Sequence, residues 1–172
     1  MKFLALTMAA ALAAIASTAC YADGFVWEVT APNFKISLPN LPAMKLETHP
    51  LNAAQPHLRL LGSEGPYTIS VLTPTADAGM TAQDCANSTI RSLPRRPGVP
   101  ALDTIFKGRI NDKTFVAIYA SSLDKFVQLH AHIMSAASGT HCIEVHASKI
   151  STSKDDVEPW FTGFTKSNIE PQ

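Results

Sequence analysis

Charged residues are scarce in this chain, and neither sign dominates. Asp, Glu, Lys and Arg make up 16% of its 172 residues, and 14 basic side chains balance 14 acidic ones. A balanced sequence provides no broad positive field for phosphates or anionic lipid, which argues against a nucleic-acid-binding function. The one local basic cluster, Arg91, Arg95 and Arg96, is short and interrupted by prolines, and we expect it to lie on a solvated loop.

Complete catalytic motifs are also missing. The chain has no Gly-x-Ser-x-Gly sequence, which positions the nucleophile of many hydrolases, and no glycine-rich loop that could cradle a phosphate. We therefore expect a non-catalytic binding or assembly module. Its partner would be an unknown envelope protein or a small ligand, held by an exposed sheet face or by the loop region 39–66.

Long apolar segments are absent except at the N-terminus. Lys2 is followed by an apolar run of about 14 residues and by small residues at 17–19, which is the pattern of a secretory signal peptide. The run is shorter than the ~20 residues that a membrane-spanning helix needs. We predict that residues 1–22 are a signal peptide and that residues 23–172 form a single domain, exported by a bacterium to the periplasm or the medium.

Cysteines are few, and the first of the three lies in the predicted cleavage zone. Cys20 resembles the lipid-attachment cysteine of bacterial lipoproteins, although Ser17 stands where that motif has leucine or another aliphatic residue. Cleavage after Ala22 removes Cys20 and leaves a soluble protein, which is the outcome we favour over a lipid anchor. In an oxidising compartment the remaining Cys85 and Cys142 are expected to form a disulfide, with two buried free thiols as the alternative.

Alternation of apolar and polar residues predicts short strands along most of the chain. In the first half, three segments each place their apolar residues on one face: Phe25, Trp27 and Val29; Phe34, Ile36 and Leu38; and Tyr67, Ile69 and Val71. In the second half, four antiparallel strands are expected at residues 104–110, 114–120, 126–135 and 140–150.

Two helices are expected beside these strands. Apolar residues at steps of three and four between positions 82 and 93 form one stripe, with Thr81 or Asp77 as the cap. A C-terminal helix would present an aromatic face that includes Trp160 and Phe164. The expected fold class is therefore α+β, with an antiparallel sheet and both helices packed on it as in an α/β/α sandwich.

The order of these elements resembles that of PsbP/Mog1-like domains, which are small exported bacterial domains. The shared order is strands, one helix, a four-stranded meander and a C-terminal helix ending in Trp160-Phe161-Thr162-Gly163-Phe164. The resemblance covers most of the mature chain. It implies an α/β/α sandwich and a binding or assembly role, because that fold has no shared catalytic residues.

The densest group of reactive side chains lies in the last two predicted strands of the meander. Four of the six histidines fall between positions 130 and 146. Because side chains alternate along a strand, His130 and His132 share one face of the first strand, and Glu144 and His146 share one face of the next. Registers that pair apolar with apolar residues place all four on the same surface of the sheet.

Two interpretations of this cluster stay open. Imidazoles and a carboxylate at cross-strand distances of about 5 Å can share one ion, which makes His130, His132, Glu144 and His146 candidate ligands of Zn²⁺ or Cu²⁺ in a metal-binding protein or a metal-dependent hydrolase. The alternative, which we favour, is that they are ordinary hydrogen-bonding residues of a protein without a cofactor. A Cys85–Cys142 disulfide would draw the first helix over one end of this histidine face.

Overall fold

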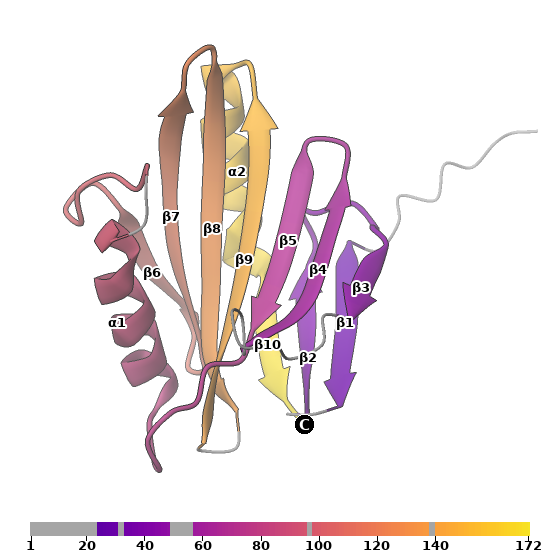
Figure 1. Ribbon diagram of the computed structural model, residues 1–172, viewed down its shortest axis with the longest axis vertical. Helices are drawn as coiled ribbons and strands as arrows, with labels where there is room; N and C mark the ends of the chain where they lie inside the picture. The colour runs from indigo at the N-terminus through magenta and orange to yellow at the C-terminus, as the bar shows by residue number, and fades with distance from the viewer. Residues whose placement is uncertain (1–23, 31–32, 49–56, 96–97, 138–139) are drawn as a thin grey trace, which may run out of the picture.

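The computed structural model describes residues 24–30, 33–48, 57–95, 98–137 and 140–172. The predicted signal peptide, its cleavage site and Cys20 lie outside these ranges. Strands contain about 52% of the described residues and helices about 20%. The protein is thus mainly β, and its strands form two antiparallel sheets (Figure 1).

The larger sheet has seven strands in the order β3-β4-β5-β9-β8-β7-β6. Its members are β3 (Leu46–Thr48), β4 (Leu58–Glu64), β5 (Tyr67–Leu72), β6 (Phe106–Asn111), β7 (Thr114–Leu123), β8 (Phe126–Ala137) and β9 (His141–Ser151). Every neighbouring pair is antiparallel. β6 to β9 confirm the four-stranded meander that the alternation predicted, and β5 extends it from the far side of β9.

The smaller sheet joins the two ends of the described chain. It consists of β1 (Phe25–Thr30), β2 (Asn33–Leu38) and β10 (Asn168–Pro171), in the order β1-β2-β10. β10 was not expected from the sequence. It pairs with β2 so that Ile169 lies opposite Ile36, and both side chains are fully buried.

The helices are short. They are α1 (Ala82–Ser92) and α2 (Val157–Gly163), with 3-10 turns at η1 (Leu93–Arg95), η2 (Lys154–Asp156) and η3 (Phe164–Lys166). The Thr81 hydroxyl accepts a hydrogen bond from the Asp84 backbone N–H, and the Asp84 carboxylate accepts one from the Thr81 N–H. This reciprocal capping box starts α1, so Thr81 rather than Asp77 is the cap.

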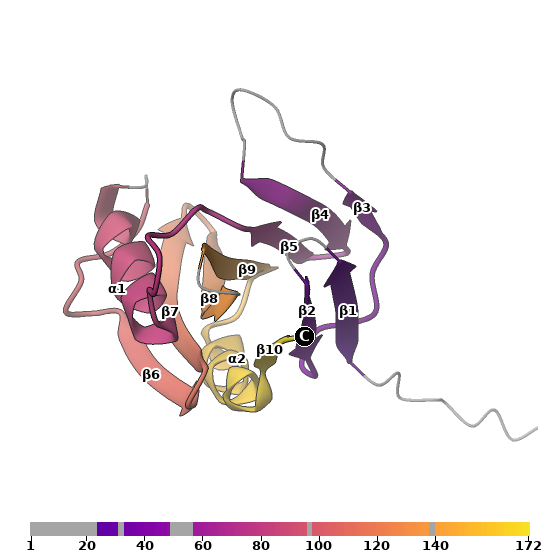
Figure 2. The same cartoon turned by 90° about the horizontal axis from the view of Figure 1, so that it is seen from below.

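The large sheet separates two layers. α1 lies on one side of it, and α2 lies with the small sheet on the other (Figure 2). The main core fills the second side, where the two sheets and α2 meet. A smaller apolar cluster lies under α1 and contains Ala86, Leu93, Ile105, Phe115, Ala117, Tyr119 and Met134.

The expected α+β class, with a helix-packed α/β/α sandwich, is therefore wrong. The layer opposite α1 is built mainly by a second sheet, because Phe34, Ile36 and Leu38 of β2 alternate inward and are fully buried. The seven-residue α2 adds Trp160 and, just beyond its end, Phe164. So short a helix cannot cover a seven-stranded sheet, whereas a packed sheet offers a continuous apolar face.

Candidate functional site: a buried histidine network beside an open sheet face

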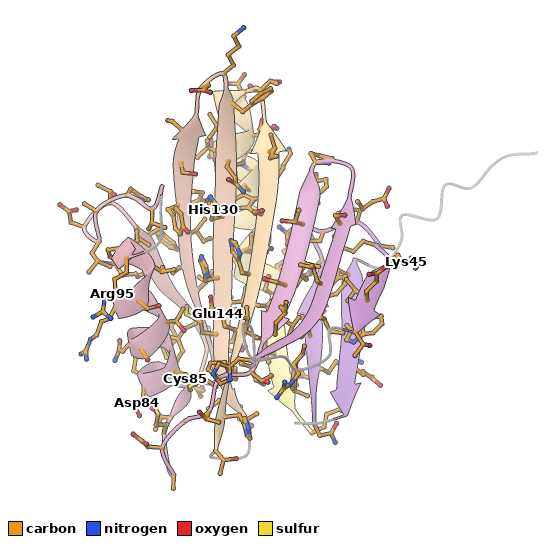
Figure 3. The ribbon with its side chains drawn as sticks, in the orientation of Figure 1. Lys45, Asp84, Cys85, Arg95, His130 and Glu144 are labelled. Atoms are coloured by element: carbon orange, nitrogen blue, oxygen red, sulfur yellow. A yellow bond between two sulfur atoms is a disulfide. The ribbon has the colours of Figure 1, made fainter. Side chains whose placement is uncertain are left out.

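Three adjacent strands bring the predicted histidine cluster together. In the β8–β9 pairing, His132 lies directly opposite His146, and His130 lies one step along, opposite Ser148. Glu144 lies opposite Met134, which belongs to the apolar cluster under α1. The four side chains therefore share the face of the sheet that carries α1, and Figure 3 labels two of them, His130 and Glu144.

His132 occupies the deepest position and has no exposed surface. Its Nδ1 lies 2.8 Å from Oε1 of Glu144, and its Nε2 lies 3.3 Å from the Tyr119 hydroxyl. An ionised carboxylate can only accept hydrogen bonds, so with Glu144 ionised Nδ1 donates and Nε2 accepts from Tyr119. The Thr89 hydroxyl on α1 donates to the other oxygen of Glu144 at 3.5 Å.

His130 forms hydrogen bonds with two side chains that are less deeply buried than His132. Its Nδ1 lies 3.1 Å from Nε2 of His146, and its Nε2 lies 3.0 Å from the Ser121 hydroxyl. Burial, and to a smaller extent the neighbouring His132, lower the pKa of His130 from 6.5 to about 4. A neutral imidazole satisfies both contacts with its one N–H and one lone pair.

Ring stacking holds the same side chains together. The ring centroids of His132 and His146 are 4.3 Å apart with planes 7° from parallel, and those of Tyr119 and His130 are 4.6 Å apart. We refer to Tyr119, His130, His132, Glu144 and His146 as the histidine network. Hydrogen bonds join these side chains to one another and to Thr89 and Ser121, and such a polar cluster matches a structural role.

The geometry gives the metal interpretation little support. Imidazole lone pairs lie in the ring plane, so the stacked rings of His132 and His146 direct theirs along parallel planes rather than toward one point. Among the described residues, no three His, Cys, Asp or Glu side chains are arranged to hold a metal ion. Zinc or copper binding by these residues stays a prediction that a titration can test.

A disulfide ties α1 to this end of the sheet. The sulfur atoms of Cys85 and Cys142 lie 2.02 Å apart, so the structure pairs the two cysteines that the sequence predicted to pair. As expected from such a bond, α1 covers one end of the histidine face. Glu144 is 4% exposed there, and Thr89, one turn after Cys85 on α1, contacts Glu144. Such a bond is compatible with an exported protein.

Two residues that contact the histidines were not predicted from the sequence. Tyr119 and Ser121 come from β7, where Tyr119 lies opposite His130. The expected β7 strand ended at position 120, one residue before Ser121. The signal was present in the hairpin: pairing the predicted strands 114–120 and 126–135 in an apolar register puts Tyr119 beside the histidines.

Beyond α1, the same side of the large sheet is left uncovered by the described helices (Figure 1). A row of directly paired residues runs from His132 through His146 and Ser70 to Leu61. Leu61 and Ile150 are 48% and 46% exposed. We call this area the open sheet face, made of Leu61, Thr68, Ser70, His146 and Ile150.

A groove lies at the β3 end of the open sheet face. It is lined by Lys45, Glu47, Leu61, Gly62, Ser63 and Thr68, and Figure 3 labels Lys45 there. β3 approaches β4 closely at this point, because a Cβ on Gly62 would lie 2.7 Å from the carbonyl oxygen of Lys45. The groove thus combines an exposed leucine with charged and hydroxyl side chains. All of its lining residues except Thr68 fall within region 39–66, which was expected to bind as a loop but contributes strands β3 and β4 here.

Comparison with known proteins adds no family assignment: no protein-family model matches the chain, and no curated protein matches it significantly. The resemblance to PsbP/Mog1-like domains therefore stays a prediction. None of the helices in the described ranges has the length and apolar character that a membrane-spanning helix requires.

Proposed function

We propose that this protein is an exported, non-catalytic binding module that holds another envelope protein against its open sheet face. The observation that carries the proposal is the contrast between the two parts of one sheet surface. His132, Glu144 and Tyr119 are buried beneath α1, while the partly exposed His146 and the neighbouring strands form a mixed apolar and polar surface.

The burial of three members of the histidine network argues against catalysis by these residues. His132, Glu144 and Tyr119 are 0%, 4% and 3% exposed, and each contacts another member of the network. A general acid or base must come within hydrogen-bond reach of its substrate, and α1 closes that approach. The network thus supports a role in fixing the sheet rather than in chemistry.

The open sheet face has the composition of a binding surface. Two large aliphatic side chains, Leu61 and Ile150, are about half exposed, and they flank the hydroxyls of Thr68 and Ser70. Exposed apolar groups rimmed by polar ones are typical of protein interaction sites. The groove at β3 would accept a protruding side chain of the partner.

The proposed location is the bacterial periplasm, reached by cleavage of residues 1–22. The disulfide supports an oxidising compartment. The intact mass of the exported protein tests this step: a chain beginning at Asp23 is expected. A chain that retains its N-terminus, or one that begins at a lipid-modified Cys20, would contradict the soluble periplasmic assignment.

Site-specific photo-crosslinking in the native cell tests the binding surface. A photoreactive amino acid at Thr68 should give one adduct of defined mass, because Thr68 lies on the open sheet face and is exposed. The same group at Glu158, which is exposed on α2, is the matched control and should give none. Leu61→Arg should abolish the Thr68 adduct by placing a charge in the apolar part of the contact.

Two outcomes would refute the proposal. One is the absence of any adduct from Thr68 when the protein is present at its natural level. The other is an identical set of adducts from Thr68 and Glu158, which would show collision rather than docking.

A further inference from the structure

A second groove, on the opposite flank of α1, is lined by positive charge. α1 packs on β7 and β8, so it separates this groove from the open sheet face. The groove lies between α1 and the edge strand β6. Its cations are Arg91 on α1 with Lys107 and Arg109 on β6, and its floor includes Ile90 and Phe115. No acidic side chain occurs among its described lining residues.

The sequence cluster of arginines extends this charge along α1. Arg91 is exposed on α1 and Arg95 is exposed in η1, so these two cations lie on helical turns rather than on the solvated loop that was expected; Arg96 lies outside the described residues. Arg91 and Arg95 also line an adjoining hollow along α1, whose one carboxylate among the described lining residues, Asp84, is engaged with Thr81 in the capping box. Figure 3 labels Arg95 and Asp84 at the two ends of this helix. Neither Arg91 nor Arg95 forms an ion pair or a side-chain hydrogen bond with another described residue.

The cations on β6 are held in place but remain available. Lys107 donates to the carbonyl oxygen of Leu102 at 2.8 Å, and the guanidinium of Arg109 lies over the Phe115 ring at 5.8 Å. Arg109 also pairs with Asp112, whose side chain is 94% exposed. Exposed ion pairs contribute little free energy, so a carboxylate that enters the groove can replace Asp112.

We propose that this groove binds an acidic polypeptide segment that lies extended along β6. The proposal is independent of the function assigned to the open sheet face. The cations form two pairs, four residues apart on α1 and η1 and two residues apart on β6, so the two members of each pair are spaced by about 6 to 7 Å. One small anion would reach a single pair, whereas alternate carboxylates of an extended chain reach several.

The edge position of β6 favours a polypeptide over other polyanions. β6 ends the seven-stranded sheet and pairs only with β7 there, so its outer backbone groups can accept an added strand. Lys107 and Arg109 would repel the same strand of a second copy, which protects the edge from self-association. The same charges attract an acidic strand, and the apolar side chains between its carboxylates would point to the opposite face of the sheet, where Phe106 of β6 is 49% exposed.

The test is fluorescence anisotropy on the mature protein with a labelled ten-residue peptide in which glutamate alternates with valine. Binding should be saturable and should weaken as salt is added. Lys107→Glu/Arg109→Glu should weaken it by about tenfold or more, and Arg91→Glu alone should weaken it measurably. Lys45→Glu/Lys125→Glu makes the same change in net charge at exposed positions, the first at the opposite edge of the sheet and the second in the turn between β7 and β8, and should leave binding within about twofold.

Hydrogen exchange locates the bound peptide. Backbone amides of β6 should exchange more slowly when the peptide is present, because an added strand shields them. The proposal is overturned by the absence of saturable binding, by equal weakening in the groove and control variants, or by binding that inorganic phosphate displaces at equal charge concentration. Binding without protection of β6 would also overturn it, since the peptide would then lie elsewhere.

Discussion

Neutral His130 should make the stability of this protein fall steeply in mild acid. The pKa of a histidine in an unfolded chain is near 6.5, and burial holds that of folded His130 at about 4. Between these values the unfolded state binds about one more proton than the native state. Stability therefore rises with pH in this window and is lost as the pH falls from about 6.5 to about 4.

The size of the effect follows from the two pKa values. Each pH unit in the window removes at most about 1.4 kcal/mol, and lowering the pH from about 7 to about 4.5 removes about 2 kcal/mol. This part of the acid sensitivity should vanish in His130→Gln, because glutamine keeps hydrogen-bonding capacity toward Ser121 and His146 but does not titrate.

Urea unfolding followed by tryptophan fluorescence measures the difference. The wild type should lose about 2 kcal/mol more free energy of unfolding than His130→Gln between about pH 7 and about pH 4.5. Ser121→Ala is the control, because it removes one contact of His130 but retains the imidazole, so it should be destabilised yet keep the wild-type pH dependence. Equal losses in wild type and His130→Gln would refute a buried neutral His130.

Three further predictions concern stability and metal binding. Cys85→Ala/Cys142→Ala should lower the free energy of unfolding by about 4 kcal/mol, because the bond closes a loop with a sequence separation of 57 residues; thiol labelling of the unreduced, denatured wild type should find no free thiol at either position. Gly163→Ala should destabilise by about 1 to 3 kcal/mol despite the higher helix propensity of alanine, because its Cβ would lie 2.8 Å from Cβ of Asn40, and Asn40→Gly should restore part of the loss in urea unfolding. Calorimetric titration with Cu²⁺ and Zn²⁺ should show no saturable binding that His130→Ala removes; loss of a tight signal in that variant would instead establish the metal site.

Local periodicity located much of the secondary structure. The apolar stripe at steps of three and four predicted α1, and alternation predicted the strands that became β6 to β9. The cross-strand placement of His130 and His146 could also be anticipated, because apolar pairing permits only registers that bring them to one face. These features depend on neighbours in sequence or on one hairpin, where few arrangements compete.

The two-sheet architecture could not be anticipated in the same way. Alternation in β2 shows that Phe34 and Ile36 must be buried, but it does not say what buries them. They pack against the facing side of the large sheet, and the small sheet that carries them is completed by β10, whose four residues carry little periodic signal and lie more than 130 positions away in the chain. For this reason the expected second helical layer was wrong, and a packed sheet stands in its place.

By itself the sequence determined the helix α1, the meander, the cysteine pair and the grouping of the histidines on one face. Tertiary structure alone decided what those groups can do. It closed His132 and Glu144 beneath α1, left Leu61 and Ile150 exposed on the neighbouring strands, and set Arg91 beside Lys107 and Arg109. The physical reason is that residue spacing specifies the face on which a side chain lies, whereas burial and charge pairing depend on which distant element packs over that face.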